Sequence, residues 1–527
     1  MTIPKIILNN KPYINGNILN LPFFNTTNAE NGTFGSPWKE QRINTAFLYR
    51  SLFLPDDTLQ KISPDLASSY TLLNDNLTYS INLSDNNYWS DGVRITIDDI
   101  IFTIEAILKD DDVLEMYRTV LSYIEGAGEF ISGEARLISG ISSNGNTLNI
   151  NLSKPYKNFM IVLSQAVIIP KHILEEEVND VGFTTLNKSS FWSNPVVSGM
   201  YMLDEVVKNP EQNDYYFKLV HNPYYTQPKS EIEEVRFHVN YQDKGLDYYE
   251  TNLVSEMVTY SNNNNYSKYD VSMFLYQYFV FNIAGNDQNY NQPIDDELFR
   301  EAIIYALNRE KMLSNVYLNN GAVTHSGLPD YNNSSNDFKF DYDPEKATEL
   351  LNNSSYNLNR VFRIAYTQDD DETILYLLSE VKSNLNAIGL EVELVYLDDS
   401  NNNLEESVYI TRDYDMLLKD LKAFNEYTWY SEYDESRIVY NNLINNATEF
   451  ENLYTLLCES TSDQAEKEYF LELQRLEQQG LYKIPMFVLN QVVYTNNERL
   501  NLPQDLNFGN SWYRYDVNLK DWSIKKD

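Results

Sequence analysis

The chain has 527 residues, more than one hydrophobic core usually supports, so we expect two or three domains. Its formal net charge of −37 argues against nucleic acid as a partner, because phosphate binding requires a basic surface. The single cysteine, Cys458, excludes an internal disulfide and a multi-cysteine metal site. Its apolar surroundings predict a small buried side chain.

The first half of the chain is predicted to be rich in strands. Residues 77–83 alternate between apolar and polar side chains, which indicates a half-buried strand. After the turn at residues 89–92, Thr96 begins a helix, and Asp99 stands three positions later as in a capping box. The longest apolar run, residues 159–170, is too short and too interrupted to cross a membrane.

The second half shows an alternation of strands and helices. Residues 273–283 form an apolar, aromatic run that predicts a buried strand, at which a second folding unit begins. Residues 295–312 are predicted as one helix, with acids in the first turn and apolar side chains on one face. Strands at 361–366 and 390–397 enclose a helix that Gly389 stops. This order predicts an α/β unit with some parallel pairing.

No motif of a known catalytic or metal site is present. The four histidines lie far apart and lack metal-ligand spacing; they are His172, His221, His238 and His325. Nucleophile-elbow, phosphate-loop and EF-hand patterns are missing. Paired carboxylates from distant segments, as in glycoside hydrolases, are neither favoured nor excluded by sequence. We therefore predict no cofactor, no metal and no catalytic residue.

Aromatic residues make up 14% of the chain and include 42 tyrosines. They are densest at residues 276–281 and 424–433. Core packing explains most single tyrosines, but tyrosine and tryptophan also suit recognition surfaces. Because acids interrupt the second cluster, we expect it to be incompletely buried and to form an aromatic and acidic cleft wall.

The N-terminal residues lack the basic region and apolar core of a signal peptide. Two interpretations stay open at this point. Either the protein is cytoplasmic, or an export segment is absent from this sequence.

A series of motifs, in order along nearly the whole chain, resembles the extracellular solute-binding proteins of the peptide and nickel type (family 5), the receptors of ATP-driven oligopeptide importers. The motifs are PDLA (64–67), WSDGVRITIDDIIFTIE (89–105), KPYKNFMIVLSQAVIIPKHIL (154–174), PVVSGMYML (195–203), HNPYY (221–225), FN (281–282) followed by PIDDELFREAIIYALNRE (293–310), YDPEKATELL (342–351), GLEVEL (389–394) and RDYDM (412–416).

The resemblance implies an α/β, two-lobed periplasmic-binding-protein-like fold of the cluster C type. Residues 1–45, 166–275 and 486–527 would form the first lobe, residues 46–165 a subdomain inserted in it, and residues 276–485 the second lobe. Two crossing strands would join the lobes, and hinge closure would enclose the solute. Such a protein binds no cofactor and catalyses no reaction.

The resemblance also implies ligand contacts. Peptide binders of this family commonly pair a carboxylate with the α-amine of the ligand, but their Trp-x-Ala-Asp-Tyr type motif is absent here. Phe424 stands near the position of that aspartate, and Asp420 or Glu426 could supply the anion. The candidate contacts are Asn25, Thr26, Thr27, Tyr260, Tyr278, Asp420, Phe424, Asn425, Glu426 and Trp429.

The leading hypothesis is therefore a monomeric substrate-binding protein that delivers peptides, expected to be oligopeptides, to the permease of an ABC transporter. It would be periplasmic or attached to a Gram-positive cell surface as a lipoprotein, touching the membrane only through a removed lipid anchor or the permease. Alternatives are a receptor for a signal peptide, a binder of an oligosaccharide or a nickel chelate on the same fold, and a hydrolase using two carboxylates.

Overall fold

The computed structural model describes part of the chain. The described residues are 17–23, 32–38, 47–56, 59, 61–73, 77–110, 113–209, 211, 214–239, 245–261, 265–283, 294, 296–325, 339–368, 371–397, 404, 406–422, 426–433, 447–460, 462–504, 506–509 and 519–525. Within them, no helix combines the length and the apolar content needed to cross a membrane.

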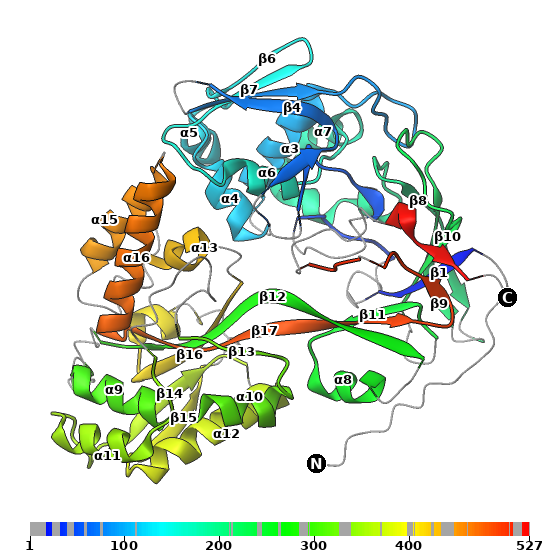
Figure 1. Ribbon diagram of the computed structural model, residues 1–527. Coiled ribbons are helices and arrows are strands. Elements are labelled where there is room, and N and C mark those ends of the chain that lie inside the picture. The colour runs from blue at the N-terminus through cyan, green and yellow to red at the C-terminus, as the bar shows by residue number, and fades with distance from the viewer. Residues whose placement is uncertain are drawn as a thin grey trace. The chain divides into compact units, whose positions relative to one another are not determined.

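Contacts divide the chain into two units, Met1–Val271 with Val492–Asp527, and Ser272–Gln491. The chain passes from one unit to the other inside two long strands, β12 (Tyr266–Phe281) and β17 (Lys483–Asn496) (Figure 1). The lobe boundaries predicted at 275/276 and 485/486 fall within these two strands. The subdomain predicted at 46–165 stays a prediction.

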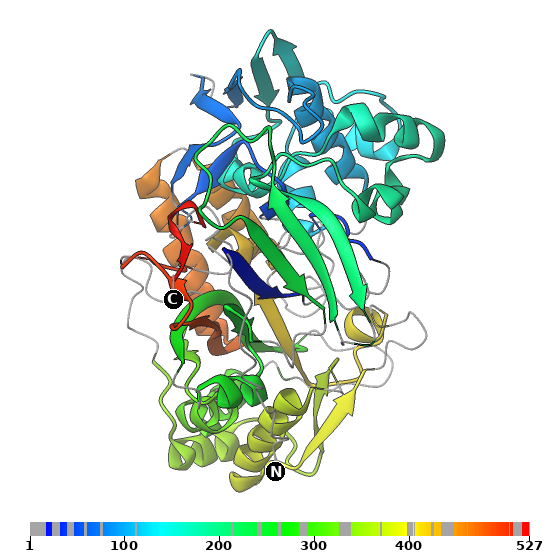
Figure 2. The same cartoon turned by 90° about the vertical axis from the view of Figure 1, so that its right-hand side faces the viewer.

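The first unit contains a four-stranded sheet in the order β1-β10-β9-β8, whose strands lie side by side in Figure 2. Strand β1 is parallel to β10, and the other neighbours are antiparallel. The strands span Ile18–Pro22 (β1), Tyr201–Asn209 (β8), Asp214–His221 (β9) and Glu234–His238 (β10). Phe217, Leu219, Val235 and Phe237 are fully buried and place part of the core of the unit on this sheet.

A second, antiparallel sheet of this unit has the order β4-β5-β7-β6. Burial alternates along β5, which confirms the half-buried strand predicted at 77–83. The remaining strands of the unit form pairs: β2 with β3, β18 with β19, and β11 with the end of β17. These strands span Phe53–Pro55 (β2), Ile62–Pro64 (β3), Ala67–Leu72 (β4), Thr78–Leu83 (β5), Ile141–Asn144 (β6), Thr147–Asn151 (β7), Tyr248–Thr251 (β11), Leu500–Asn501 (β18) and Ser523–Ile524 (β19).

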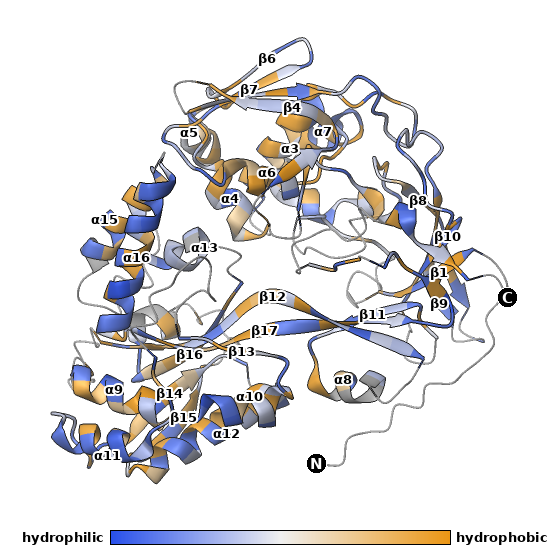
Figure 3. Cartoon of the chain, in the orientation of Figure 1, coloured by the Kyte–Doolittle hydropathy of each residue, from blue (hydrophilic) through white to orange (hydrophobic). Residues whose placement is uncertain are grey.

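Helices α3 and α6 are mostly hydrophobic in Figure 3, in agreement with their burial on several faces. Helix α3 begins with the predicted capping box, because the Asp99 carboxylate accepts a hydrogen bond from the backbone N–H of Thr96 at 2.8 Å. The helices of the unit are α3 (Ile97–Lys109), α4 (Glu115–Leu121), α5 (Ala127–Ser132), α6 (Phe159–Gln165), α7 (Lys171–Val181) and α8 (Val254–Ser261), with 3-10 turns η1 (Phe183–Lys188) and η2 (Ser190–Ser193).

Several of the motifs that carry the resemblance meet in this unit through hydrogen bonds. In the turn at residues 89–92, the Asp91 carboxylate lies 2.8 Å from Nε2 of His172, which belongs to the 154–174 motif. Ser90 exchanges two hydrogen bonds with Val197 of the 195–203 motif, at 2.8 and 3.0 Å. These motifs therefore act as determinants of the fold.

Gly199 shows why one of these positions requires glycine. A Cβ atom there would lie 2.5 Å from the backbone oxygen of Phe47 and 2.8 Å from that of Leu48. The side chain of Asn222, from the 221–225 motif, donates to the backbone oxygen of Gly199 at 3.0 Å. Any larger residue at 199 would have to displace this neighbouring backbone.

In the second unit, the sheet has the order β17-β12-β16-β14-β15, with β13 paired to β17. Strand β14 is parallel to both β15 and β16, which confirms the predicted parallel pairing. The strands span Gly321–Val323 (β13), Phe362–Tyr366 (β14), Val392–Tyr396 (β15) and Met416–Lys422 (β16). The helices are α9 (Glu297–Ala306), α10 (Arg309–Tyr317), α11 (Pro344–Asn353), α12 (Glu372–Ala387), α13 (Glu426–Tyr430), α15 (Ala447–Cys458) and α16 (Asp463–Gly480), with a π-helical turn η4 (Glu406–Thr411) and a 3-10 turn η5 (Ser431–Tyr433).

The single helix predicted at 295–312 is wrong, because the structure has two helices there, α9 and α10. Leu307 adopts an extended conformation with ψ of 112° and ends α9. The side chain of Asn308 then accepts a hydrogen bond from the N–H of Lys311 and caps α10. Two other local predictions are confirmed. Gly389 follows α12 with a φ of +92°, and Cys458 is buried.

Candidate functional site

Asp420, one of the predicted contacts, lies half-buried on β16 of the second unit, and two neutral amides donate hydrogen bonds to its carboxylate. Gln277, directly opposite on β12, donates from its amide nitrogen to the Asp420 carboxylate at 3.1 Å. The amide of Gln368 donates to the other carboxylate oxygen at 3.5 Å. The described residues place no cation within ion-pair distance of Asp420.

The orientation of Gln277 is fixed by a third residue. The hydroxyl of Tyr317, on α10, donates to the amide oxygen of Gln277 at 2.7 Å. This bond makes the amide oxygen the acceptor and leaves the amide nitrogen directed at Asp420. Tyr317, Gln277 and Asp420 therefore form one hydrogen-bonded chain from α10 across β12 to β16.

Asp420 and Gln368 lie at the carboxyl ends of two parallel strands, β16 and β14, which is where open α/β sheets commonly bind ligands. Burial raises the pKa of the Asp420 carboxyl, while the bonds from Gln277 and Gln368 act in the opposite direction. The charge of Asp371, at the start of α12, adds to the increase. A positive charge beside Asp420 would offset both the free-energy cost of burying the carboxylate and its repulsion by Asp371.

A second polar cluster of the same unit is closed by its own lysines. Lys483, at the start of β17, has a fully buried side chain whose ammonium lies 3.0 Å from Glu432 and 3.4 Å from Glu477. Lys419, on β16, lies 2.9 Å from the other oxygen of Glu432. Two carboxylates thus face two ammonium groups, and their formal charges cancel.

Three aromatic side chains form the walls of this cluster. Two of them, Tyr278 and Trp429, are predicted ligand contacts, and the third is Tyr433. The hydroxyl of Tyr278 donates to Glu432, with its oxygen 2.8 and 2.9 Å from the two carboxylate oxygens. The indole N–H of Trp429 donates to Glu477 at 2.9 Å, and the Tyr433 hydroxyl donates to it at 2.6 Å. Tyr278 and Trp429 are both fully buried, and their role as ligand contacts stays a prediction.

Residues 424–433 were expected to be incompletely buried, but in the part whose burial is described, 427–433, every side chain except the half-buried Thr428 is buried. Trp429 and Tyr433 are buried there, as is the interleaved acid Glu432. The physical reason is the ion pairing with Lys419 and Lys483, which offsets the cost of removing the Glu432 charge from water. An acid between aromatic residues was interpreted as a sign of an exposed wall. Here it marks a buried carboxylate that is paired with lysines.

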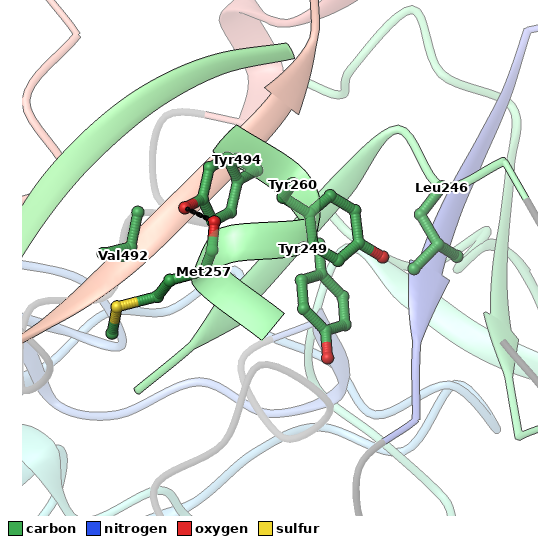
Figure 4. Close-up of a cluster of buried hydrophobic side chains, with 6 residues drawn as sticks. All are labelled: Leu246, Tyr249, Met257, Tyr260, Val492 and Tyr494. Atoms are coloured by element: carbon green, nitrogen blue, oxygen red, sulfur yellow. Dashed lines mark hydrogen bonds between the residues drawn. The ribbon is translucent and has the colours of Figure 1, made fainter. Parts of the chain in front are cut away.

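Tyr260 lies in a hydrophobic cluster of the first unit, drawn in Figure 4. Its ring stacks on Tyr249 with centroids 4.4 Å apart and on Tyr494, from the end of β17, with centroids 5.2 Å apart. The Tyr494 hydroxyl donates to the backbone oxygen of Met257 at 3.1 Å. These contacts pack α8 against the end of β17, and a ligand contact of Tyr260 stays a prediction.

The other predicted contacts are not described. Asn25, Thr26, Thr27, Phe424 and Asn425 lie outside the described residues. Glu426 begins α13, but the structure does not describe its side chain.

Sequence reasoning missed the partners that define both clusters. They are Gln277, Tyr317 and Gln368 around Asp420, and Lys419, Glu432, Glu477 and Lys483 in the second cluster. A usable signal existed for two of them. Gln277 and Lys483 are polar residues inside otherwise apolar runs, FLYQYFVF and LYKIPMFVL, and such residues need a partner when buried.

Asp420 thus offers an anion held by two neutral amide donors, a group that can pair with a cation. Among the described residues, no group of three or more histidine, cysteine, aspartate or glutamate side chains could hold a metal ion.

Comparison with known proteins gives relatives across much of the chain. It is 24% identical over 325 residues to a putative ABC transporter peptide-binding protein from Brucella ovis, a match covering 59% of this chain and 55% of that protein. It is 24% identical over 377 residues to a dipeptide-binding protein from Lactococcus lactis, covering 64% and 66%. The chain thus spans about half to two thirds of the length of these curated relatives.

Solved structures share the fold at low sequence identity. A putative peptide binding protein, AppA, from Clostridium difficile superimposes with a TM-score of 0.77 at 17% identity, covering 96% of this chain and 100% of that one. NikZ from Campylobacter jejuni, solved in complex with Ni(L-His), gives 0.70 at 19%, covering 99% and 100%. The predicted α/β, periplasmic-binding-protein-like fold class is confirmed.

The family itself follows from the sequence match. The model of the bacterial extracellular solute-binding proteins, family 5, matches residues 61–435, which is well over half of the chain. The resemblance read from the motifs is therefore confirmed, and the chain belongs to the bacterial extracellular solute-binding proteins of family 5.

Proposed function

We propose that this protein is the substrate-binding protein of an ABC importer and that it captures peptides outside the cytoplasm. Membership in an extracellular solute-binding family supports the location, and the peptide binding stated in the names of its relatives supports the ligand class. Its partners are the peptide and the permease of the transporter. In this proposal the protein is a monomer, either periplasmic or attached to the cell surface by a lipid anchor, and it binds its ligand without catalysing a reaction. The proposal includes hinge closure by bending within β12 and β17.

The observation that carries the proposal is that Asp420 is half-buried and that its described hydrogen-bond partners are uncharged. Glu432 and Glu477 each have an ammonium group of the chain beside them, whereas the described partners of Asp420 are two neutral amides. A half-buried carboxylate of this kind gains most from a cation supplied by the ligand. The ammonium at the N-terminus of a peptide, or on a lysine side chain, has this chemistry.

Thermal unfolding in the presence of a pooled peptide library tests the ligand class. A ligand at 100 times its dissociation constant adds about 2.7 kcal/mol of stability, which is a measurable rise in melting temperature. A pool that leaves the melting temperature unchanged, while oligosaccharides or nickel chelates raise it, would refute the peptide assignment.

Asp420→Asn tests the anchor once a peptide has been found. A hydrogen bond to a charged group contributes about 1.5–3 kcal/mol, so we expect an affinity loss of roughly 10- to 150-fold. N-acetylation of the peptide should reproduce the loss in the wild-type protein if the α-amine is the cation. The matched control is Glu349→Gln, the same change of charge on the exposed side of α11, which should leave affinity unaltered. Wild-type affinity in Asp420→Asn would exclude this carboxylate as the anchor.

A nickel–histidine chelate is the second candidate, favoured by the similarity in fold to the NikZ complex over 99% of this chain. The same unfolding assay separates the two ligands. Stabilisation by nickel together with histidine, and by no peptide, would replace the peptide proposal. A signal receptor, by contrast, would bind peptide, but deleting its gene would abolish a response without reducing peptide uptake.

A further inference from the structure

The ammonium group of Lys483 is enclosed on several sides in the second unit. Its nitrogen lies 4.0 Å from the ring centroid of Trp429, 4.8 Å from that of Tyr433 and 5.2 Å from that of Tyr278. The carboxylates of Glu432 and Glu477 lie at 3.0 and 3.4 Å. Rings around a cation, with acids to balance its charge, are the chemistry by which proteins recognise ammonium ligands.

The walls of this cage come from different elements and bind one another without the lysine. Tyr278, on β12, donates to Glu432 of η5. Trp429, on α13, donates to Glu477 of α16, and Tyr433 donates to the same carboxylate. The cage is therefore held together by hydrogen bonds that do not involve its occupant.

Among the described residues, two carboxylates and two ammonium groups contribute the charges of the cage. The ammonium of Lys419 lies 2.9 Å from one carboxylate oxygen of Glu432, and the side chain of Lys419 is more exposed than that of Lys483. Lys483 is the ammonium that contacts both carboxylates, and it has no exposed side-chain surface.

We propose that Glu432, Glu477 and the rings of Tyr278, Trp429 and Tyr433 form a primary-ammonium site whose occupant is Lys483 of the same chain. The tethered ammonium fixes η5 and α13 to α16 and β17, whichever solute the protein carries. It also excludes the ammonium of a ligand from these two carboxylates. Emptied by truncation of the lysine, the cage should accept a free alkylammonium ion.

Lys483→Ala with n-propylammonium tests the proposal, because this ion replaces the atoms that the substitution removes beyond Cβ. Thermal unfolding and calorimetric titration should show a saturable rise in melting temperature and saturable heat for Lys483→Ala. The wild-type protein should show neither, and the neutral analogue 1-propanol should not substitute for the ion. Lys419→Ala, which removes the more exposed ammonium from the same carboxylate, should not respond.

A folded Lys483→Ala protein that ignores n-propylammonium, or responds equally to 1-propanol, would overturn the proposal. An equal response of the wild-type protein would do the same. If Lys483→Ala does not fold, reductive methylation of the wild-type protein followed by peptide mass spectrometry decides. Lys483 should stay unmodified while exposed lysines such as Lys467 are methylated, and methylation of both at similar rates would contradict the cage. No peptide is involved, so the result is independent of the proposed transport function.

Discussion

The buried charge cluster allows a quantitative prediction for Lys483→Met. Methionine keeps most of the volume of the lysine stem, so the substitution removes the charge and leaves little cavity. Glu432 and Glu477 are only 7% and 3% exposed, and water cannot readily solvate the charge left behind. The summed formal charge of the four described side chains, Lys419, Lys483, Glu432 and Glu477, changes from zero to −1.

Removing one partner of a buried ion pair costs about 3–5 kcal/mol. We expect a loss in this range for Lys483→Met. The double variant Lys483→Met/Glu477→Gln restores neutrality, and the glutamine oxygen can still accept the bonds from Trp429 and Tyr433. It should therefore be more stable than the single variant by about 2 kcal/mol, the cost of leaving a buried group uncompensated.

Urea unfolding at pH 7 gives the free energies, and hydrogen exchange of peptides from β17 assigns the change to the second unit. Lys467→Met, at an exposed position of α16, is the control and should stay within about 0.5 kcal/mol of the wild type. Two results would refute the reasoning. One is a cost below about 1 kcal/mol for Lys483→Met, and the other is a double variant no more stable than the single one.

Three further predictions concern single positions. Burial and the Arg309 guanidinium lower the pKa of His325 to about 4, so the folded state should lose stability as the pH falls from about 6.5 to 4. His325→Gln should remove about 1–2 kcal/mol of that loss in urea unfolding at pH 4.5, after allowance for the partial exposure of the imidazole. Tyr260→Ala should cost about 3–5 kcal/mol in the unfolding of the first unit, because the ring is buried between two stacked tyrosines. Gly389→Ala should cost only about 1–2 kcal/mol, since no atom blocks a Cβ there and strain at φ +92° is the sole penalty; a larger loss would indicate an unseen contact.

Much of the fold was predictable because its signals are local. The cap of α3 depends on Thr96 and Asp99, three positions apart, and the end of α12 depends on one glycine. The parallel pairing of β14 with β15 follows from a helix of suitable length between two strands. Each of these features can be recognised within a short window of sequence.

The break between α9 and α10 shows where such windows fail. Apolar spacing continues across Leu307 and Asn308, so periodicity alone predicts one helix. Asn308 is a good N-cap residue, and its side chain does cap α10. Nothing else in the neighbouring sequence distinguishes it from an asparagine on the polar face of a continuous helix. The capping signal was present and weaker than the periodicity.

The candidate site was less predictable because its partners are distant in sequence. Gln277 and Asp420 are separated by 143 positions, and only the antiparallel register of β12 and β16 brings them opposite each other. The same register places Lys419 opposite Tyr278, next to the cage. Neighbouring residues of one strand, Lys419 and Asp420, thus enter two different clusters through the alternation of side chains across the sheet.

On the two faces of β16, this alternation separates a lysine-paired acid, Glu432, from Asp420, whose described partners are amides. Glu432 lies between aromatic residues and looked equally suited to bind a cation, but Lys419 and Lys483 already neutralise it. Asp420 lies on the opposite face of β16 from Lys419, where Gln277 and Gln368 donate hydrogen bonds without adding charge. Under the proposal that Asp420 anchors the ligand, the density of acids does not locate the anion. The face of β16 does, because among the described residues the lysines lie with Glu432 on one face and the amides lie with Asp420 on the other.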